Sequence, residues 1–182
     1  MMKFCSDCAA PLVRLVPPGD HLERSVCGAC GTVHYENPRI VVGCVPEWQG
    51  RILLCRRAIE PRRGFWTTPA GFLEIGETLA DAAARECFEE AEARVEIGAL
   101  LSVTNVLHAA QVHVMFRARM RDAQCAPGRE SLETGLYEAA QIPWPQIAFP
   151  SIEFALRCFL ADRAAGAATA VHFSSVDRSR RG

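Results

Sequence analysis

The sequence has no long run of apolar residues. None of its 182 residues belongs to an apolar stretch that approaches the ~20 residues a membrane-spanning helix needs. The opening residues Met-Met-Lys-Phe-Cys carry one charge and lack the apolar segment of a secretory signal. These two absences predict a cytoplasmic protein that is neither exported nor embedded in a membrane.

An excess of charge of one sign is also absent. The chain has 20 Lys and Arg against 21 Asp and Glu, a net charge of −1, which argues against non-specific binding of nucleic acid or acidic membrane as its main task. Apolar residues make up 49% of the chain, enough for a core, so a wholly disordered protein is excluded. The length fits one domain, or one domain with a small appendage.

Cysteine, in contrast, is abundant and unevenly placed. Four of the nine cysteines form two Cys-x-x-Cys pairs, Cys5 with Cys8 and Cys27 with Cys30, separated by 18 residues. This spacing is typical of a closed four-cysteine Zn²⁺ site with a structural role. Redox or disulfide pairs are the alternative, and His21 or His34 could replace a ligand. The remaining cysteines, Cys44, Cys55, Cys87, Cys125 and Cys158, are expected to pack as small apolar residues, with Cys125 beside a loop.

The order of the predicted elements indicates an α/β fold in three segments. Residues 1–36 are expected to form a zinc ribbon, too small to fold without its metal. Residues 37–163 are expected to form the main domain, and residues 164–182 a mobile tail. Strands are predicted over 39–45, 51–57, 95–105, 111–120 and 132–138, and helices over 78–92 and 152–163. The mixture of strands and helices argues for a layered domain.

The first predicted helix gathers three carboxylates. Glu86, Glu89 and Glu90 fall within an arc of about 100° on a helix, where like charges repel unless a cation such as Mg²⁺ binds them. A solvated acidic face is the alternative. The opposite side, expected to pack against the core, carries Ala80, Ala84, Cys87, Phe88 and Ala91.

The surrounding residues resemble the Nudix box, Gly-x5-Glu-x7-Arg-Glu-x2-Glu-Glu. Its positions fall on Gly71, Glu77, Arg85, Glu86, Glu89 and Glu90, and the glycine that ends the family's helix is replaced by Glu92. The resemblance implies a Nudix α/β/α sandwich with a mixed sheet. It also implies that the three glutamates and the Gly71 carbonyl hold Mg²⁺ or Mn²⁺, with Glu130 or Glu133 as a further acid. Glu77 and Arg85 would brace the loop against the helix.

A zinc ribbon before a Nudix domain is similar to two enzyme groups. Segments 35–44, 64–71 and 127–133 look closer to plant FAD and ADP-ribose pyrophosphatases than to NADH pyrophosphatases, whose Ser-Gln-Pro-Trp array we judge absent at 142–151. The resemblance therefore implies cleavage of FAD to FMN and AMP, or of ADP-ribose to AMP and ribose 5-phosphate. NADH is the alternative substrate. It also implies a homodimer.

A different class of function is a zinc-ribbon binding module whose Nudix domain senses a ligand. Against it, the ribbon has Lys3, Arg14 and Arg24 against four acids, so it lacks the basic patch that nucleic-acid binding needs.

Three further residues are candidates for contacts to a substrate. Arg56 and Arg57 could face phosphates and Phe72 could stack on a ring, although a solvated strand end and a core position are the alternatives. For His108 and His113, the sequence suggests no partner.

Overall fold

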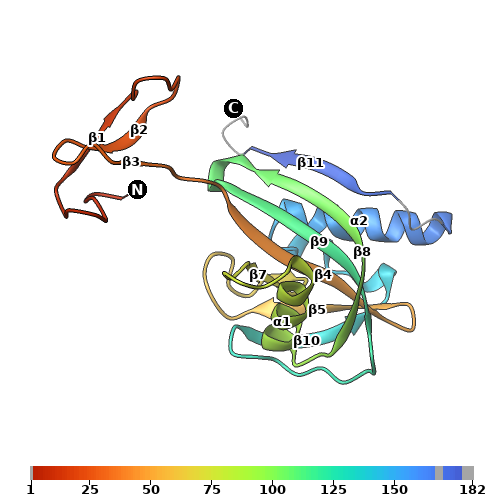
Figure 1. Cartoon of the computed structure of the whole chain (residues 1–182). Coiled ribbons are helices and arrows are strands. Elements are labelled where there is room, and N and C mark those ends of the chain that lie inside the picture. Colours follow the sequence, from red (N-terminus) through yellow and green to blue (C-terminus); the bar gives the residue numbers. More distant parts are fainter. Residues whose placement is uncertain (1, 167–169, 178–182) are drawn as a thin grey trace. The chain divides into compact units, whose positions relative to one another are not determined.

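The chain folds into two compact units, Met1–Asn37 and Pro38–Gly182 (Figure 1). The computed structural model describes residues 2–166 and 170–177. Within that part of the chain, no helix combines the length and the apolar character needed to cross a membrane.

The N-terminal unit is a small antiparallel sheet with few buried side chains. Its strands are β1 (Leu12–Leu15), β2 (Arg24–Cys27) and β3 (Val33–His34), in the order β1-β2-β3. Large apolar residues such as Phe4, Val13 and Leu22 are exposed, whereas Cys5, Val26 and Cys27 are buried. A unit with so little buried apolar surface needs a further source of stability.

The second unit is built on one large mixed sheet. Its strands are β4 (Arg39–Trp48), β5 (Arg51–Arg57), β6 (Trp66–Thr67), β7 (Ala70–Phe72), β8 (Val95–Val106), β9 (Gln111–Met120), β10 (Ser131–Tyr137) and β11 (His172–Val176). The main path is β10-β5-β4-β9-β8-β11, with β6 paired to β5 and β7 to β4. The β4–β9 and β8–β11 pairs are parallel and the others are antiparallel, which confirms the mixed sheet.

Helices cover both faces of this sheet. Helix α1 (Leu79–Ala91) packs on the face that carries Val42 and Cys44 of β4, and α2 (Pro150–Ala165) packs on the face that carries Val45. Successive strand residues point to opposite faces, so one strand contributes to both cores. The expected α/β/α sandwich is confirmed. Three short 3₁₀ helices, Leu107–Ala109, Ala139–Gln141 and Trp144–Gln146, complete the described elements.

The buried face of α1 differs from the expected one. Ala82, Ala83, Cys87 and Ala91 have no exposed surface, whereas Phe88 is 48% exposed, so its expected packing position was wrong. Small alanines allow α1 to lie close to β4. The arc of the helix that is buried is therefore the one that faces the sheet. Helical periodicity could not supply that information. The buried positions of Cys44, Cys55 and Cys87 confirm their packing role.

Helix α1 ends at the family's glycine position without a glycine. Glu92 is the C-cap in the left-handed conformation, with φ 49° and ψ 19°, and its N–H donates to the Phe88 carbonyl. An L-residue with a Cβ pays roughly 1–2 kcal/mol for this conformation.

We therefore expect Glu92→Gly to stabilise the protein. The free energy of unfolding should rise by about 0.5–1 kcal/mol, because glycine adopts φ > 0 without a Cβ clash. Thermal unfolding should show a midpoint higher by about 2–4 °C per kcal/mol. Glu92→Ala removes the same carboxylate but keeps a Cβ, so it serves as the matched control. An equal gain in both variants would assign the effect to charge rather than to backbone strain.

The segment expected to be a mobile tail contains a strand. Strand β11 pairs in parallel with β8, with His172 opposite Ser102 and Val176 opposite Val106. The His172 Nε2 also lies 2.9 Å from Asp162 Oδ2 on α2. The expectation was wrong for these residues because an open sheet edge can recruit a short segment that has few large apolar residues. The remaining tail positions, 167–169 and 178–182, lie outside the described residues.

Candidate functional site

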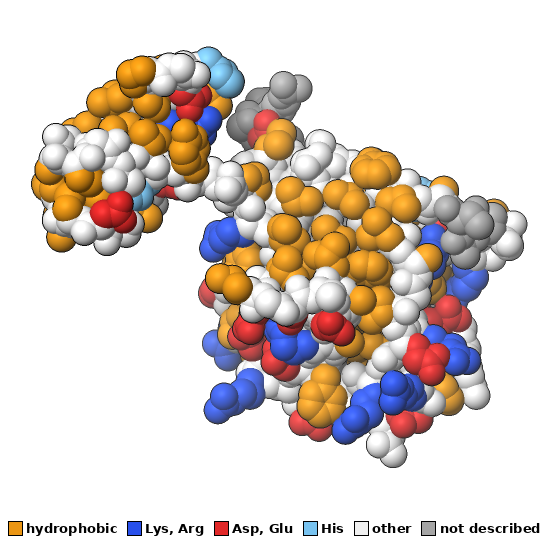
Figure 2. Space-filling view, in the orientation of Figure 1, with side chains coloured by type: hydrophobic (Ala, Val, Ile, Leu, Met, Phe, Trp, Pro, Cys, Tyr) orange, Lys and Arg blue, Asp and Glu red, His pale blue; other side chains and the backbone are white. Residues whose placement is uncertain are grey.

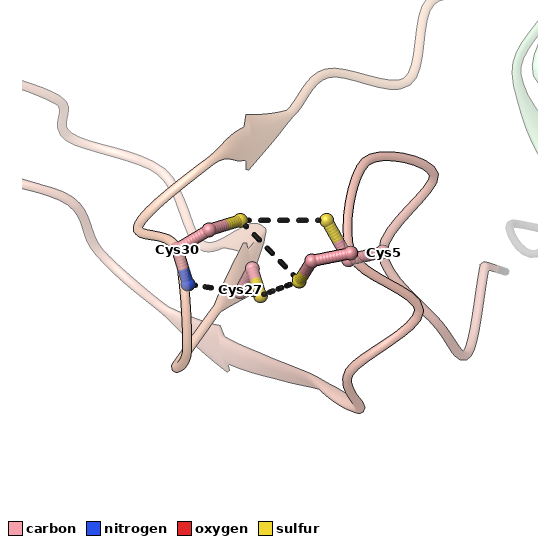
Figure 3. Close-up of side chains that lie close together, drawn as sticks. Cys5, Cys27 and Cys30 are labelled. Carbon is pink, nitrogen blue, oxygen red and sulfur yellow. Dashed lines mark hydrogen bonds between the residues drawn. The ribbon is translucent and has the colours of Figure 1, made fainter.

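The four clustered cysteines converge in the N-terminal unit. Their sulfur atoms all lie within 4.8 Å of one another. Cys5 lies 3.6 Å from Cys30, and Cys8 lies 3.4 Å from Cys27 and 3.6 Å from Cys30 (Figure 3). Four thiolates around Zn²⁺ at ~2.3 Å stand roughly 3.8 Å apart, whereas a disulfide needs about 2.05 Å. The cluster therefore fits a closed zinc site rather than two disulfides.

Polar groups surround the thiol cluster. His34 Nε2 lies 3.3 Å from Cys5 Sγ, and the Asp7 backbone N–H donates to the same sulfur at 3.4 Å. The Thr32 hydroxyl lies 3.2 Å from Cys30 Sγ and is the main cause that lowers the pKa of this thiol to about 6. The lowered pKa favours the thiolate form of Cys30, which is the form that binds metal. His34 thus contacts the Cys5 sulfur and does not take the place of a cysteine in the cluster. His21 is exposed beside Asp20.

The second cluster of candidate residues lies on α1. Thr78 begins the helix, since its side chain accepts from the Asp81 N–H, as the capping pattern predicts. Glu86 and Glu90 are 8% and 7% exposed, whereas Glu89 points toward solvent. Two of the three expected metal ligands are therefore buried carboxylates. Figure 2 shows acidic and basic side chains intermixed around α1.

Arg85 connects the glutamates to the preceding loop. Its guanidinium donates to both carboxylate oxygens of Glu77, at 3.0 and 2.7 Å, and to Glu86 at 2.7 Å and Glu89 at 3.0 Å. A further bond reaches the Phe72 carbonyl at 3.1 Å. These hydrogen bonds lower the pKa of Glu77 to about 2 and raise that of Arg85. One planar side chain thus binds three carboxylates and connects the loop to the helix.

Replacing Arg85 with lysine is expected to loosen this arrangement. An ammonium cannot reproduce the planar bidentate contact with Glu77, so we expect a loss of about 1–3 kcal/mol in the free energy of unfolding and a lower kcat. Arg157→Lys is the matched control, because Arg157 pairs with Glu153 on the exposed surface of α2. Denaturant unfolding and steady-state kinetics would measure both effects. Equal behaviour of the two variants would contradict a bracing role for Arg85.

The two buried carboxylates differ in their partners: Glu86 pairs with Arg85, whereas Glu90 has no cationic side chain within ion-pair distance among the described residues. Burial raises the pKa of Glu90 to about 8, with Glu86 as the second cause, and burial also raises the pKa of Glu86. Glu90 accepts one hydrogen bond, from the Ala70 N–H at 3.3 Å. A Cβ on Gly71 would stand 2.2 Å from Glu86 Oε1, so glycine is needed for the loop to approach the carboxylate. Oxygen donors crowded in this way fit a hard divalent cation.

A cleft of about 1020 Å³ adjoins these carboxylates. Among the expected site residues, it is lined by Arg57, Gly71, Phe72, Arg85, Glu86, Glu89, Glu90 and Glu130. Arg56 and Glu133 are not among the lining residues. They are cross-strand partners in the β5–β10 register and form an ion pair at 3.6 Å, an arrangement that strand periodicity without the register could not reveal.

Sequence reasoning missed several residues of the cleft. Arg129 lines it beside Glu130, and Gln111, His113 and Ser151 form a polar wall. No spacing signal connects Ser151 with β9, since the two meet through the packing of α2 on the sheet. Only knowledge of how α2 packs on the sheet could have brought Ser151 and His113 together. His108 also lines the cleft.

Family models match both units of the chain. The model described as Nudix N-terminal, a zinc ribbon, matches residues 3–36, and the model described as NUDIX domain matches residues 37–142. The second match covers more than half of the chain, and its range includes β4 to β10, α1 and the carboxylate cluster.

Individual relatives of the chain are also Nudix hydrolases or share their fold. The crystal structure of a NUDIX hydrolase from Nitrosomonas europaea is 47% identical, with a TM-score of 0.93 over 97% of this chain and 100% of that one. The NAD-capped RNA hydrolase NudC of Chromobacterium violaceum is 39% identical over 95 residues, which are 52% of this chain but only 34% of that protein. An ADP-ribose pyrophosphatase from Streptococcus suis shares the fold, with 18% identity and a TM-score of 0.60 over 75% of this chain and 99% of that one.

Proposed function

Because the chain belongs to the NUDIX family of hydrolases, we propose that it cleaves the diphosphate bond of a nucleoside diphosphate derivative, with FAD or ADP-ribose as the substrate. The observation that carries the proposal is the pair of buried carboxylates, Glu86 and Glu90, on the wall of a large cleft. Burial of two carboxylates without a cation has a large desolvation free energy. A divalent cation bound there would also contact the negatively charged diphosphate of the substrate.

Nudix enzymes use a divalent metal, and the donor set here fits Mg²⁺ or Mn²⁺. We propose Glu86, Glu89, Glu90 and the Gly71 carbonyl as its ligands, with Glu130 as a further acid in the same cleft. When bound, the metal neutralises phosphate charge and makes a coordinated water more acidic. Glu133 is less suited to this role because it pairs with Arg56.

The chain's own residues then bind and orient the substrate. Arg57, Arg62 and Arg129 line the cleft and can contact phosphate oxygens, to which guanidinium groups bind in a bidentate manner. Phe72 is 46% exposed and offers a face for a substrate ring, while the Arg39 guanidinium stands 4.7 Å from the centre of its ring. Arg85 and Glu77 hold the loop and helix rigid, which suits a reaction that depends on positioning.

NADH or another NAD-linked molecule is the second candidate substrate. The identity to NudC of Chromobacterium violaceum favours it, although the matched part spans about a third of that relative's length. Segment 142–151 lacks the residue order of the NADH-type array, and we take this difference to favour FAD or ADP-ribose.

A direct comparison of substrates tests the proposal. Purified protein with Mg²⁺, and separately with Mn²⁺, would be incubated with ADP-ribose, FAD and NADH, and the products separated by chromatography. We expect AMP from each accepted substrate, together with ribose 5-phosphate, FMN or reduced nicotinamide mononucleotide. Failure to release AMP from all three would refute the proposed substrate class.

We further propose that residues 1–36 form a structural zinc ribbon, residues 37–163 the catalytic domain, and that the enzyme is a cytoplasmic homodimer. A ligand-sensing role remains the rival function. It would be favoured by tight ADP-ribose binding without cleavage, or by tight, salt-sensitive DNA binding in a gel-shift experiment.

A further inference from the structure

Three polar residues form a hydrogen-bonded chain on the cleft wall. His113 of β9 is 8% exposed and Ser151 of α2 is 2% exposed. His113 Nε2 lies 3.0 Å from Gln111 Oε1, and its Nδ1 lies 2.9 Å from Ser151 Oγ. All three residues line the cleft, and none belongs to the proposed metal ligands or to α1.

The donor and acceptor roles of the His113 ring nitrogens follow from the hydrogen bonds that Ser151 and Gln111 can make. Burial lowers the pKa of His113 to about 4, so at neutral pH one ring nitrogen donates and the other accepts. His113 is the one side-chain partner of the Ser151 hydroxyl among the described residues. If Ser151 donates to Nδ1, Nε2–H donates to the Gln111 carbonyl oxygen, and each donor has an acceptor.

This arrangement fixes the orientation of the Gln111 amide. Its oxygen is held by His113, whereas its nitrogen has no acceptor within the described part of the chain. The amide therefore offers unpaired N–H donors beside an oxygen with one free lone pair, on the wall of the cleft. A donor next to an acceptor complements the N7 and N6 edge of adenine.

We propose that Gln111 recognises the adenine base of the substrate and that His113, held by Ser151, positions its amide. The inference rests on the proposed function, because FAD, ADP-ribose and NADH share an adenylate half. Hypoxanthine presents an acceptor oxygen where adenine presents an amino group, so the Gln111 oxygen would face another acceptor. Gln111 is thus the residue that selects between the two bases.

Binding of AMP and IMP to the full-length protein, measured by calorimetry, tests the role of Gln111. We expect wild-type protein to bind AMP about tenfold or more tightly than IMP, in line with a bidentate amide contact. Gln111→Glu should weaken AMP binding and bring the ratio close to one, since a carboxylate has no donor for N7. Gln146→Glu makes the same change at an exposed position outside the cleft lining and should leave the ratio unchanged.

A second pair of variants tests positioning by His113. His113→Leu removes both hydrogen bonds and should reduce the AMP-to-IMP ratio, with a higher KM for ADP-ribose and little change in kcat. His113→Gln can still accept from Ser151 and donate to Gln111, so it should restore most of the ratio. If His113 had a purely structural role, both variants would change the free energy of unfolding and leave the AMP-to-IMP affinity ratio unchanged.

The outcomes separate this inference from the proposed function. Equal affinity of wild-type protein for AMP and IMP, or an unchanged ratio in Gln111→Glu, would overturn the inference even if ADP-ribose is hydrolysed. If no dinucleotide is cleaved but AMP binding depends on Gln111, the proposed function fails and base recognition by Gln111 stands.

Discussion

Replacing Glu90 with glutamine is expected to abolish most hydrolytic activity while stabilising the metal-free protein. The amide is a poorer ligand for a hard cation, and a loss of ~3–5 kcal/mol in transition-state stabilisation corresponds to a fall in kcat of roughly 10²- to 10³-fold or more. Stability should rise because burial raises the pKa of Glu90 to about 8, so at pH 7 the metal-free fold must bind a proton that the unfolded chain does not, and an amide removes this cost. Opposite changes in activity and stability are the mark of a site built to hold a cation.

Steady-state kinetics with Mg²⁺ would measure the loss of activity, and denaturant unfolding in the presence of a chelator would measure the gain in stability. Glu89→Gln should lose activity without the gain in stability, because Glu89 is exposed. Glu153→Gln on α2 is the matched control, since Glu153 pairs with Arg157 at the surface and should affect neither. Mg²⁺ should raise the unfolding midpoint of the wild-type protein more than that of Glu90→Gln. Wild-type turnover by Glu90→Gln would show that the metal assignment is wrong.

Loss of zinc is expected to unfold the N-terminal unit while the second unit keeps its fold. The N-terminal unit buries few apolar side chains, so its structure depends on the ion that its four thiols can hold. Cys27→Ser should reduce bound zinc from one ion per chain to well below one, because Cys27 lies in the buried half of the cluster. The cleft belongs to the second unit, so nucleotide hydrolysis should persist.

Atomic absorption would measure the zinc content, and limited proteolysis would locate the unfolded segment. New cleavage sites should appear before residue 38 in Cys27→Ser and in chelator-treated wild-type protein. Cys158→Ser is the matched control, because Cys158 lies on α2 of the second unit and is not one of the four clustered cysteines. Proteolytic resistance of the N-terminal unit after zinc removal would contradict this account, as would a full complement of zinc in Cys27→Ser.

Much of the framework could be predicted from local patterns. The strands β4 and β5 and the helices α1 and α2 follow from a β-branched run with a hairpin partner and from helical periodicity, each of which depends on neighbouring residues. The two candidate metal sites could also be predicted from the spacing of residues along the sequence. Four thiols at fixed intervals and three carboxylates on one helical arc are visible without knowledge of the tertiary structure.

The remaining features depend on contacts between distant segments. Arg56 and Glu133 pair because the β5–β10 register places them opposite each other. His113 acquires Ser151 as a partner only when α2 packs on the sheet, and Phe88 is exposed because the sheet covers another arc of α1. Periodicity defines the faces of an element, but it does not say which neighbour will cover them.

The position of β11 has a consequence for the order in which the chain folds during synthesis. This strand completes the edge beside β8, yet it is made only after β9, β10 and α2. Until β11 leaves the ribosome, β8 has an open row of backbone donors and acceptors that another nascent chain can pair with. Once made, β11 pairs with β8 and covers this row of donors and acceptors.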